Sequence, residues 1–405
     1  MEHLGGVLIA LFAVASGVAL VVRRLRIPYT VGLVLAGLAL GTTSVIHPPA
    51  LTKELLFGVF LPGLIFEAAF HLDFEKFRRN QLAIFSLALP GVAAAIAITA
   101  ALITTVATAL HFAGDFKLVH GLVFGALVSA TDPIAVVALF KSLGTPSRLG
   151  VLIEGESLLN DGTAVVFFSL ISGVAMGGRV SVAGASLEFA RVVGIGLAAG
   201  GVIGFLASHV IRQVDDAMIE ITVTTIAAYG SFAASEGLHG SGVIATVVAG
   251  MLCGNYGART GMSPTTRVAA EAFWEYAAFA LNSMVFLLIG FEVHLSRLAS
   301  AWLPIVTAYL AVTVGRALVI LIVSWLLRRT RERLPWSWSA VMAWGGLRGA
   351  LSMVLALALP SDFPHRDLLI TMTFGVVVLS ILIQGLTMAT LLRRLRIVDE
   401  SSDDR

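Results

Sequence analysis

Long apolar segments, separated by short charged or Pro/Gly-rich breaks, occupy almost the whole chain. An α-helix of about 20 apolar residues crosses the roughly 30 Å hydrocarbon layer of a membrane. Of the 405 residues, 58% are hydrophobic and only 13% are charged, whereas soluble domains carry about 25% charged residues. The sequence therefore predicts an all-α polytopic membrane protein with little chain left for a soluble domain.

We place thirteen transmembrane helices on these apolar runs. They cover about residues 4 to 22, 28 to 44, 54 to 71, 82 to 106, 118 to 140, 149 to 173, 188 to 211, 218 to 236, 240 to 256, 271 to 291, 300 to 327, 337 to 359 and 367 to 392. In the loops between them, nineteen Lys and Arg residues fall on one side and six on the other. Since cytoplasmic loops carry the excess of positive charge, we expect a multi-pass protein of the cell (inner or plasma) membrane with its N-terminus outside. Residues 393 to 405 then form a short cytoplasmic tail.

Several other classes of site are disfavoured by composition. A single cysteine, Cys253, excludes an intrachain disulfide and a cysteine-based zinc cluster, and the nine His residues show no ligand-type spacing. We therefore expect no cofactor. The basic clusters serve as topology signals, because a nucleic-acid interface would need them gathered on one soluble face.

Two predicted helices are interrupted near their middles, and each has a charged residue at the break. Pro133 interrupts the segment 118 to 140, and three glycines interrupt the segment 337 to 359: Gly345, Gly346 and Gly349. Backbone groups freed at such breaks must be satisfied by protein, water or a bound ion. The two segments are seven helices apart and run in opposite directions, which indicates an inverted repeat and a secondary transporter site. Two kinks used only for packing are the alternative.

The stretch GESLLND, residues 155 to 161, places four oxygen-bearing side chains on one stripe of a helix: Glu156, Ser157, Asn160 and Asp161. A hard cation without its water shell needs several oxygen ligands. Thr131 and Asp132 at the first break add oxygens if the two helices touch. A charge at the bilayer centre costs at least about 2.5 kcal/mol. This cost favours a cation site over simple hydrogen bonding within the bundle.

Two arginines, Arg316 and Arg348, also fall within predicted transmembrane segments. Because Arg keeps its proton at any accessible pH, each needs a permanent counter-charge. We hypothesise that Arg316 holds Glu156 ionised, while Asp132 and Arg348 balance the half-helix dipoles at the two breaks. Asp161 is then the acid that is free to change its protonation state.

The motifs GESLLNDGTAVV, SATDPIAVVALF and GGLRGALS, together with the surroundings of Arg316, resemble the monovalent cation/proton antiporters of the NhaP type and the eukaryotic sodium/proton exchangers. The resemblance covers essentially the whole chain. It implies an NhaA-like inverted-repeat antiporter fold with two broken, crossing helices, the fifth and the twelfth. It also implies a homodimer, with a core at about residues 82 to 173 and 300 to 392 and a dimerisation scaffold at about residues 1 to 71 and 188 to 291.

The resemblance further implies roles for individual residues. The position of Asp161 binds the cation and the proton alternately, and Glu156 pairs with Arg316. Three further positions hold or organise the ion site: Thr131, Ser157 and Asn160. Asn at position 160, in place of a second Asp, marks the electroneutral branch of the family.

The predicted function is therefore a secondary antiporter, not an enzyme, that exchanges Na+ or Li+ for H+ one for one. A K+/H+ or broad alkali-cation antiporter is the first alternative, because ligand types alone do not determine ion size. More remote alternatives are a cation channel, although no filter-like carbonyl run is present, and an intramembrane aspartyl protease with Asp132 and Asp161 as its dyad. The neighbouring arginines and Asn160 disfavour the protease.

Overall fold

The computed structural model describes residues 2–25, 27–43, 52–112, 114–178, 181–293 and 295–397. Every regular element within these ranges is a helix, which confirms the all-α prediction. The end of the predicted tail, residues 398–405, lies outside the described residues.

The first part of the chain forms ten α-helices and two π-helical segments in its described residues. They are α1 (Glu2–Leu25), α2 (Tyr29–Thr43), α3 (Lys53–Leu55), a π-helical segment (Leu56–Phe60), α4 (Leu61–His71), α5 (Phe74–Arg79), α6 (Gln81–Ser86), a second π-helical segment (Leu87–Gly91), α7 (Val92–Leu110), α8 (Leu118–Leu127), α9 (Ile134–Leu143) and α10 (Ser147–Ala175).

The helices of the second part follow in the same manner. They are α11 (Val182–Ile211), α12 (Ala217–Gly237), α13 (Gly242–Leu252), a π-helical segment (Cys253–Gly257), α14 (Ala258–Thr260), α15 (Pro264–Glu292), α16 (Leu295–Ser300), α17 (Trp302–Leu327), α18 (Trp336–Trp344), α19 (Ala350–Leu357), α20 (Arg366–Leu379), a π-helical segment (Ser380–Gly385) and α21 (Leu386–Arg394).

Eight continuous helical stretches in the described part of the chain are long and apolar enough to cross a membrane. They are Lys53–His71, Gln81–Leu110, Ser147–Ala175, Ala183–Ile211, Ala217–Gly237, Pro264–Glu292, Trp302–Leu327 and Arg366–Arg394. Shorter apolar helices lie at Gly6–Val22, Tyr29–Thr42, Leu118–Leu127 and Ile134–Leu143. The protein is a multi-pass membrane protein.

The start of α15 differs from the expected residue 271, because the helix begins at Pro264. Ser263 caps it by accepting a hydrogen bond from the amide of Thr266, and Pro264 occupies the first turn, where a missing amide costs nothing. These polar first turns are helical although they precede the apolar run, so hydrophobicity alone places the boundary too late.

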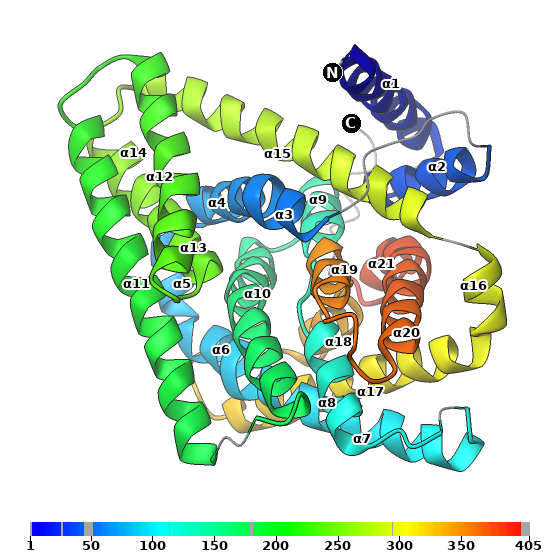
Figure 1. Ribbon diagram of the computed structural model, residues 1–405. Helices are drawn as coiled ribbons and strands as arrows, with labels where there is room; N and C mark the ends of the chain where they lie inside the picture. Colours follow the sequence, from blue (N-terminus) through cyan, green and yellow to red (C-terminus); the bar gives the residue numbers. More distant parts are fainter. Residues whose placement is uncertain are drawn as a thin grey trace.

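The helices pack as two sets, which Figure 1 shows side by side. In one set, α13 packs against α4, α11 and α12, and the long helix α15 runs from α12 across α4 to α2. In the other set, α17 packs against α7, α18 and α20, and α8 packs against α7 and α10. Helix α10, which carries the GESLLND stretch, also contacts α4 and α13, so it lies at the boundary between the two sets.

Helix α11 approaches α13 closely through glycines spaced four residues apart. A Cβ atom on Gly200 would lie 2.8 Å from the Cα atom of Ala245, and one on Gly204 would lie 2.8 Å from the Cα atom of Ala249. Both distances are shorter than real Cβ contacts, so these positions need glycine. This packing holds α11 against α13, which in turn contacts α4 and α10.

Candidate functional site

Two non-helical stretches meet in the second set of helices. One lies between α8 and α9, at residues 128–133, and the other lies between α18 and α19, at residues 345–349. The amide of Asp132 donates a 2.8 Å hydrogen bond to the carbonyl of Leu347, so the two stretches touch. Gly349 is required at this contact, since a Cβ atom there would lie 2.5 Å from Oδ2 of Asp132. The interruptions therefore bring backbone groups from distant parts of the chain to one place.

Each charged residue where the two stretches touch forms hydrogen bonds with backbone groups at a helix end. Nη1 of Arg348 donates to the carbonyls of Ser129 (2.9 Å) and Ala130 (3.0 Å), just after the C-terminal end of α8. The carboxylate of Asp132 accepts a 3.0 Å hydrogen bond from the amide of Ile134, the first residue of α9. A cation at a helix C-terminus and an anion at an N-terminus both offset the helix dipole. Within the described residues, Arg348 makes no ion pair with a carboxylate.

The polar stripe of α10 binds to the first of these stretches. Oγ of Ser157 donates to the carbonyl of Thr131, and Nδ2 of Asn160 donates to Oγ1 of Thr131 at 2.9 Å. All three residues are buried, and Oδ1 of Asn160 has no hydrogen-bond partner in the described part of the chain. An unpartnered buried oxygen has an acceptor position to offer to a ligand. Thr131, Ser157 and Asn160 therefore form one connected group of oxygens.

Arg316 of α17 and Glu156 of α10 form a buried bidentate ion pair. The distances are 2.8 Å from Nη1 to Oε1 and 2.9 Å from Nη2 to Oε2, and the residues are 9% and 3% exposed. Nε of Arg316 donates to the carbonyl of Met342 near the end of α18, at 3.0 Å. A fork-to-fork pair of this kind satisfies both groups and cancels their charges. Glu156 thus has its partner and does not line the cavity described next.

Asp161 faces a cavity of about 770 Å³, including its open mouth, between the two sets of helices. The cavity wall on the side of α10 and the α8–α9 stretch includes Thr131, Asp132, Ser157 and Asp161. Asp132 and Asp161 are half-buried because they line this space. The structure therefore brings together four of the predicted oxygen-bearing residues on the wall of one cavity, whereas Asn160 and Glu156 do not line it.

Three residues that line the wider cavity did not belong to the predicted ion site. Glu67 of α4 and Glu154 of α10 line it, and Asn282 of α15 lines it from the first set of helices. Asn282 is 9% exposed, and its Oδ1 atom has no hydrogen-bond partner within the described ranges. Its only signal in the sequence is a polar residue in the apolar run FALNSMVFLLIG.

A carboxylate that lines a cavity beside two touching non-helical stretches inside a multi-pass bundle is the arrangement of a secondary ion transporter. The fold and the site place the protein in that class. The chain belongs to the sodium/hydrogen exchanger family, whose transmembrane model matches residues 7–394. It is therefore a transporter and not an enzyme.

Relatives of known name and known structure match almost the whole chain. The chain is 39% identical over 384 residues to the Na+/H+ antiporter ApNhaP of Aphanothece halophytica, covering 94% of this chain and 72% of that protein. It is 36% identical over 407 aligned positions to the Na+/H+ antiporter NhaH of Halobacillus dabanensis, covering 96% and 98%. The solved structure of the sodium proton antiporter MjNhaP1 from Methanocaldococcus jannaschii at pH 8 matches with a TM-score of 0.79 and 20% identity, over 98% of this chain and 99% of that chain. The folds are therefore shared.

Proposed function

We propose that the protein exchanges a monovalent cation, sodium, for a proton across the membrane, with both competing for Asp161. The family to which the chain belongs and the activity in the names of its relatives support cation/proton antiport. The group of Thr131, Ser157 and Asp161 on the cavity wall supports the choice of site, since a hard cation without its water needs several oxygen ligands.

The observation that carries this proposal is the bidentate pair between Glu156 and Arg316. It removes one acid and one base from the charge balance of the site. The carboxylate of Asp132 is held at the start of α9, which leaves Asp161 as the acid that binds either ion. Asp161 is then neutral with a proton and neutralised with a sodium ion. One proton exchanges for one sodium ion, and no net charge crosses the membrane.

The proposal includes the architecture in which this exchange occurs. Thirteen crossings place the N-terminus outside the cell membrane and the C-terminus in the cytoplasm, and α8 with α9 and α18 with α19 each form one broken crossing. The core, at about residues 82 to 173 and 300 to 392, moves the site past a scaffold at about residues 1 to 71 and 188 to 291. Two such chains form a homodimer through the scaffold.

The test is a flux measurement in liposomes with the membrane potential clamped. A sodium gradient should drive proton movement in the opposite direction, followed with an internal pH dye. Asp161→Asn should abolish this flux in folded protein, and the matched variant Asp215→Asn, at an exposed carboxylate, should retain it. Sodium-dependent proton flux in Asp161→Asn would overturn the assignment. The absence of flux in the wild type with sodium, lithium or potassium would overturn antiport itself.

A further inference from the structure

A second, smaller cavity lies beside the two intramembrane arginines and shares no lining residue with the cavity of Asp161. It is partly open and is lined by residues of α17, α18, the α18–α19 stretch, α20 and the π-helical segment Ser380–Gly385. It has room for about one water molecule. The cation site does not use this space.

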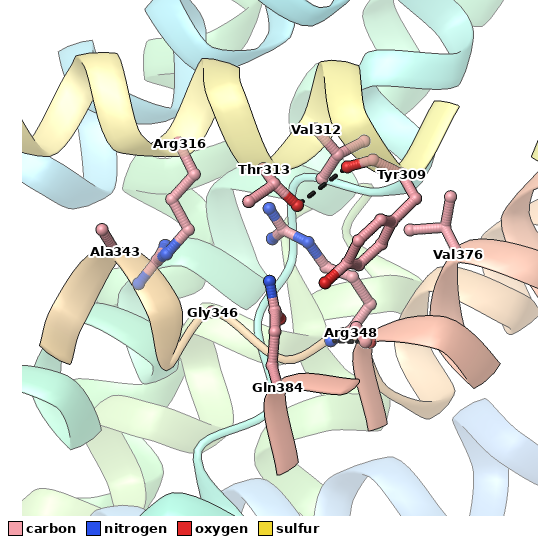
Figure 2. A pocket seen from close by; sticks show the side chains of 10 residues that line it. Tyr309, Val312, Thr313, Arg316, Ala343, Gly346, Arg348, Val376 and Gln384 are labelled. Carbon is pink, nitrogen blue, oxygen red and sulfur yellow. Dashed lines mark hydrogen bonds between the residues drawn. The ribbon is translucent and has the colours of Figure 1, made fainter. Parts of the chain in front are cut away.

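Three buried polar atoms around this cavity have no hydrogen-bond partner among the residues that the structure describes: Oη of Tyr309, Nε of Arg348 and Oε1 of Gln384. The residues are 8%, 4% and 3% exposed. Figure 2 shows the three side chains pointing to the same space, from three different elements. A buried polar group without a partner costs about 1 to 3 kcal/mol. Three such groups around one small cavity therefore indicate a site for one small hydrogen-bonding ligand.

We propose that one bound water molecule occupies this cavity and connects Arg348 to Tyr309 and Gln384. The water accepts from Nε–H of Arg348 and donates to Oε1 of Gln384, while the hydroxyl of Tyr309 is its third partner. Buried waters typically make about three hydrogen bonds of this kind. A cation is excluded, because the guanidinium groups of Arg316 and Arg348 both line the cavity.

This water makes Tyr309 and Gln384 positioning residues for Arg348. Nη1 of Arg348 holds the carbonyls of Ser129 and Ala130, which directly precede Thr131 in the cation site. The backbone amide of Arg348 donates to Oγ of Ser380, the first residue of the π-helical segment that carries Gln384. Such π-helical segments are frequent at functional sites. Without the water, Nε of Arg348 has no hydrogen bond to the described part of the chain. The guanidinium group then holds the carbonyls of Ser129 and Ala130 less firmly in position.

The inference rests on the proposed antiport and is tested by sodium-dependent proton flux in liposomes. Tyr309→Phe and Gln384→Met keep the volume of each side chain and remove one polar group. We expect each to raise the sodium concentration for half-maximal exchange about fivefold to tenfold, with a smaller change in maximal rate. Both changes remove the same water, so their effects should not multiply. In the double variant, the sodium concentration for half-maximal exchange should exceed that of the more affected single variant by about twofold at most.

The matched control is Thr307→Val on the same helix, since the hydroxyl of Thr307 is already bonded to the carbonyls of Leu303 and Pro304. It should exchange as the wild type does. Wild-type sodium dependence in both single variants, or fully multiplied effects in the double variant, would overturn the inference while leaving the wild-type flux intact. Failure of the proposed antiport would instead abolish flux in the wild type.

A structure determined at a resolution that shows waters gives a readout independent of transport and of variant folding. One water within hydrogen-bond distance of Tyr309, Arg348 and Gln384 is the expected result. An empty cavity would overturn the inference. A chloride ion bound in place of the water would also overturn it, and in that case the effects of the variants would disappear when gluconate replaces chloride.

Discussion

Breaking the pair between Glu156 and Arg316 should destabilise the protein strongly, because the remaining charge would be buried without a partner. The two residues are 3% and 9% exposed, and two short hydrogen bonds join them. Removing one member of a buried pair costs about 3 to 5 kcal/mol. Arg316→Ala also removes the bond to the carbonyl of Met342, which adds about 1 kcal/mol. We therefore expect Arg316→Ala to be the more damaging variant, at about 4 to 6 kcal/mol.

The assay is thermal unfolding of detergent-purified protein, compared with a matched exposed pair. Arg267 and Glu271 are joined at 2.8 Å, and their side chains are 46% and 37% exposed. Arg267→Ala should cost about 0.5 kcal/mol or less, since solvent screens such a pair. The double variant Glu156→Gln/Arg316→Met leaves no unpaired charge, so it should recover much of the loss. Unfolding of Arg316→Ala and Glu156→Ala at the wild-type temperature would contradict a cost of leaving one buried charge unpaired, and so would a double variant that is no more stable than either single variant.

Three further predictions concern the crossing, the proton and the connection between α4 and α6. Gly349→Ala should reduce exchange about 10- to 100-fold, because the new Cβ atom would displace Asp132. Unchanged flux would show that the contact between the two non-helical stretches tolerates a side chain. If a proton and sodium compete for Asp161, each unit of falling pH should raise the sodium concentration for half-maximal exchange by up to about tenfold, with little effect on the maximal rate; a fall in maximal rate alone would contradict competition. The backbone amide of Lys76 holds the pKa of Asp73 below its usual value of 3.8, so the stability that Asp73 contributes at the start of α5 is present at neutral pH and lost as the pH falls below that value. Asp73→Ala should therefore cost about 0.5 to 1 kcal/mol at pH 7, and thermal unfolding should show this difference shrinking towards pH 3.

Most helices of this protein could be located from the sequence, because membrane insertion depends on hydrophobicity summed over about 20 neighbouring residues. The boundary of α15 was missed for the same reason, since its capped first turns are polar. The candidate site residues could also be identified from the sequence. An ionisable side chain such as that of Asp161 in an apolar helix is expensive, so its presence indicates a function whatever the fold.

The partners of these residues could be stated only as a hypothesis. From the residues alone, Glu156 and Asp132 are the acids available to Arg316, and the pair that forms joins Arg316 to Glu156, 160 positions away. Arg348 reaches carbonyls 219 and 218 positions away, where it satisfies the end of α8 and not a carboxylate. Such contacts depend on how the helices cross, which no local pattern records.

The sequence by itself determined the membrane location, the helical content and the identity of the buried acids and bases, because each of these follows from the chemistry of neighbouring residues. Only the tertiary structure decided which oxygens meet at the crossing, that Asp161 opens on a cavity while Glu156 does not, and that Tyr309, Arg348 and Gln384 surround a common space. The physical reason is that hydrogen bonds and ion pairs act over about 3 Å. Helices distant in the chain must therefore be packed together before these partners are chosen.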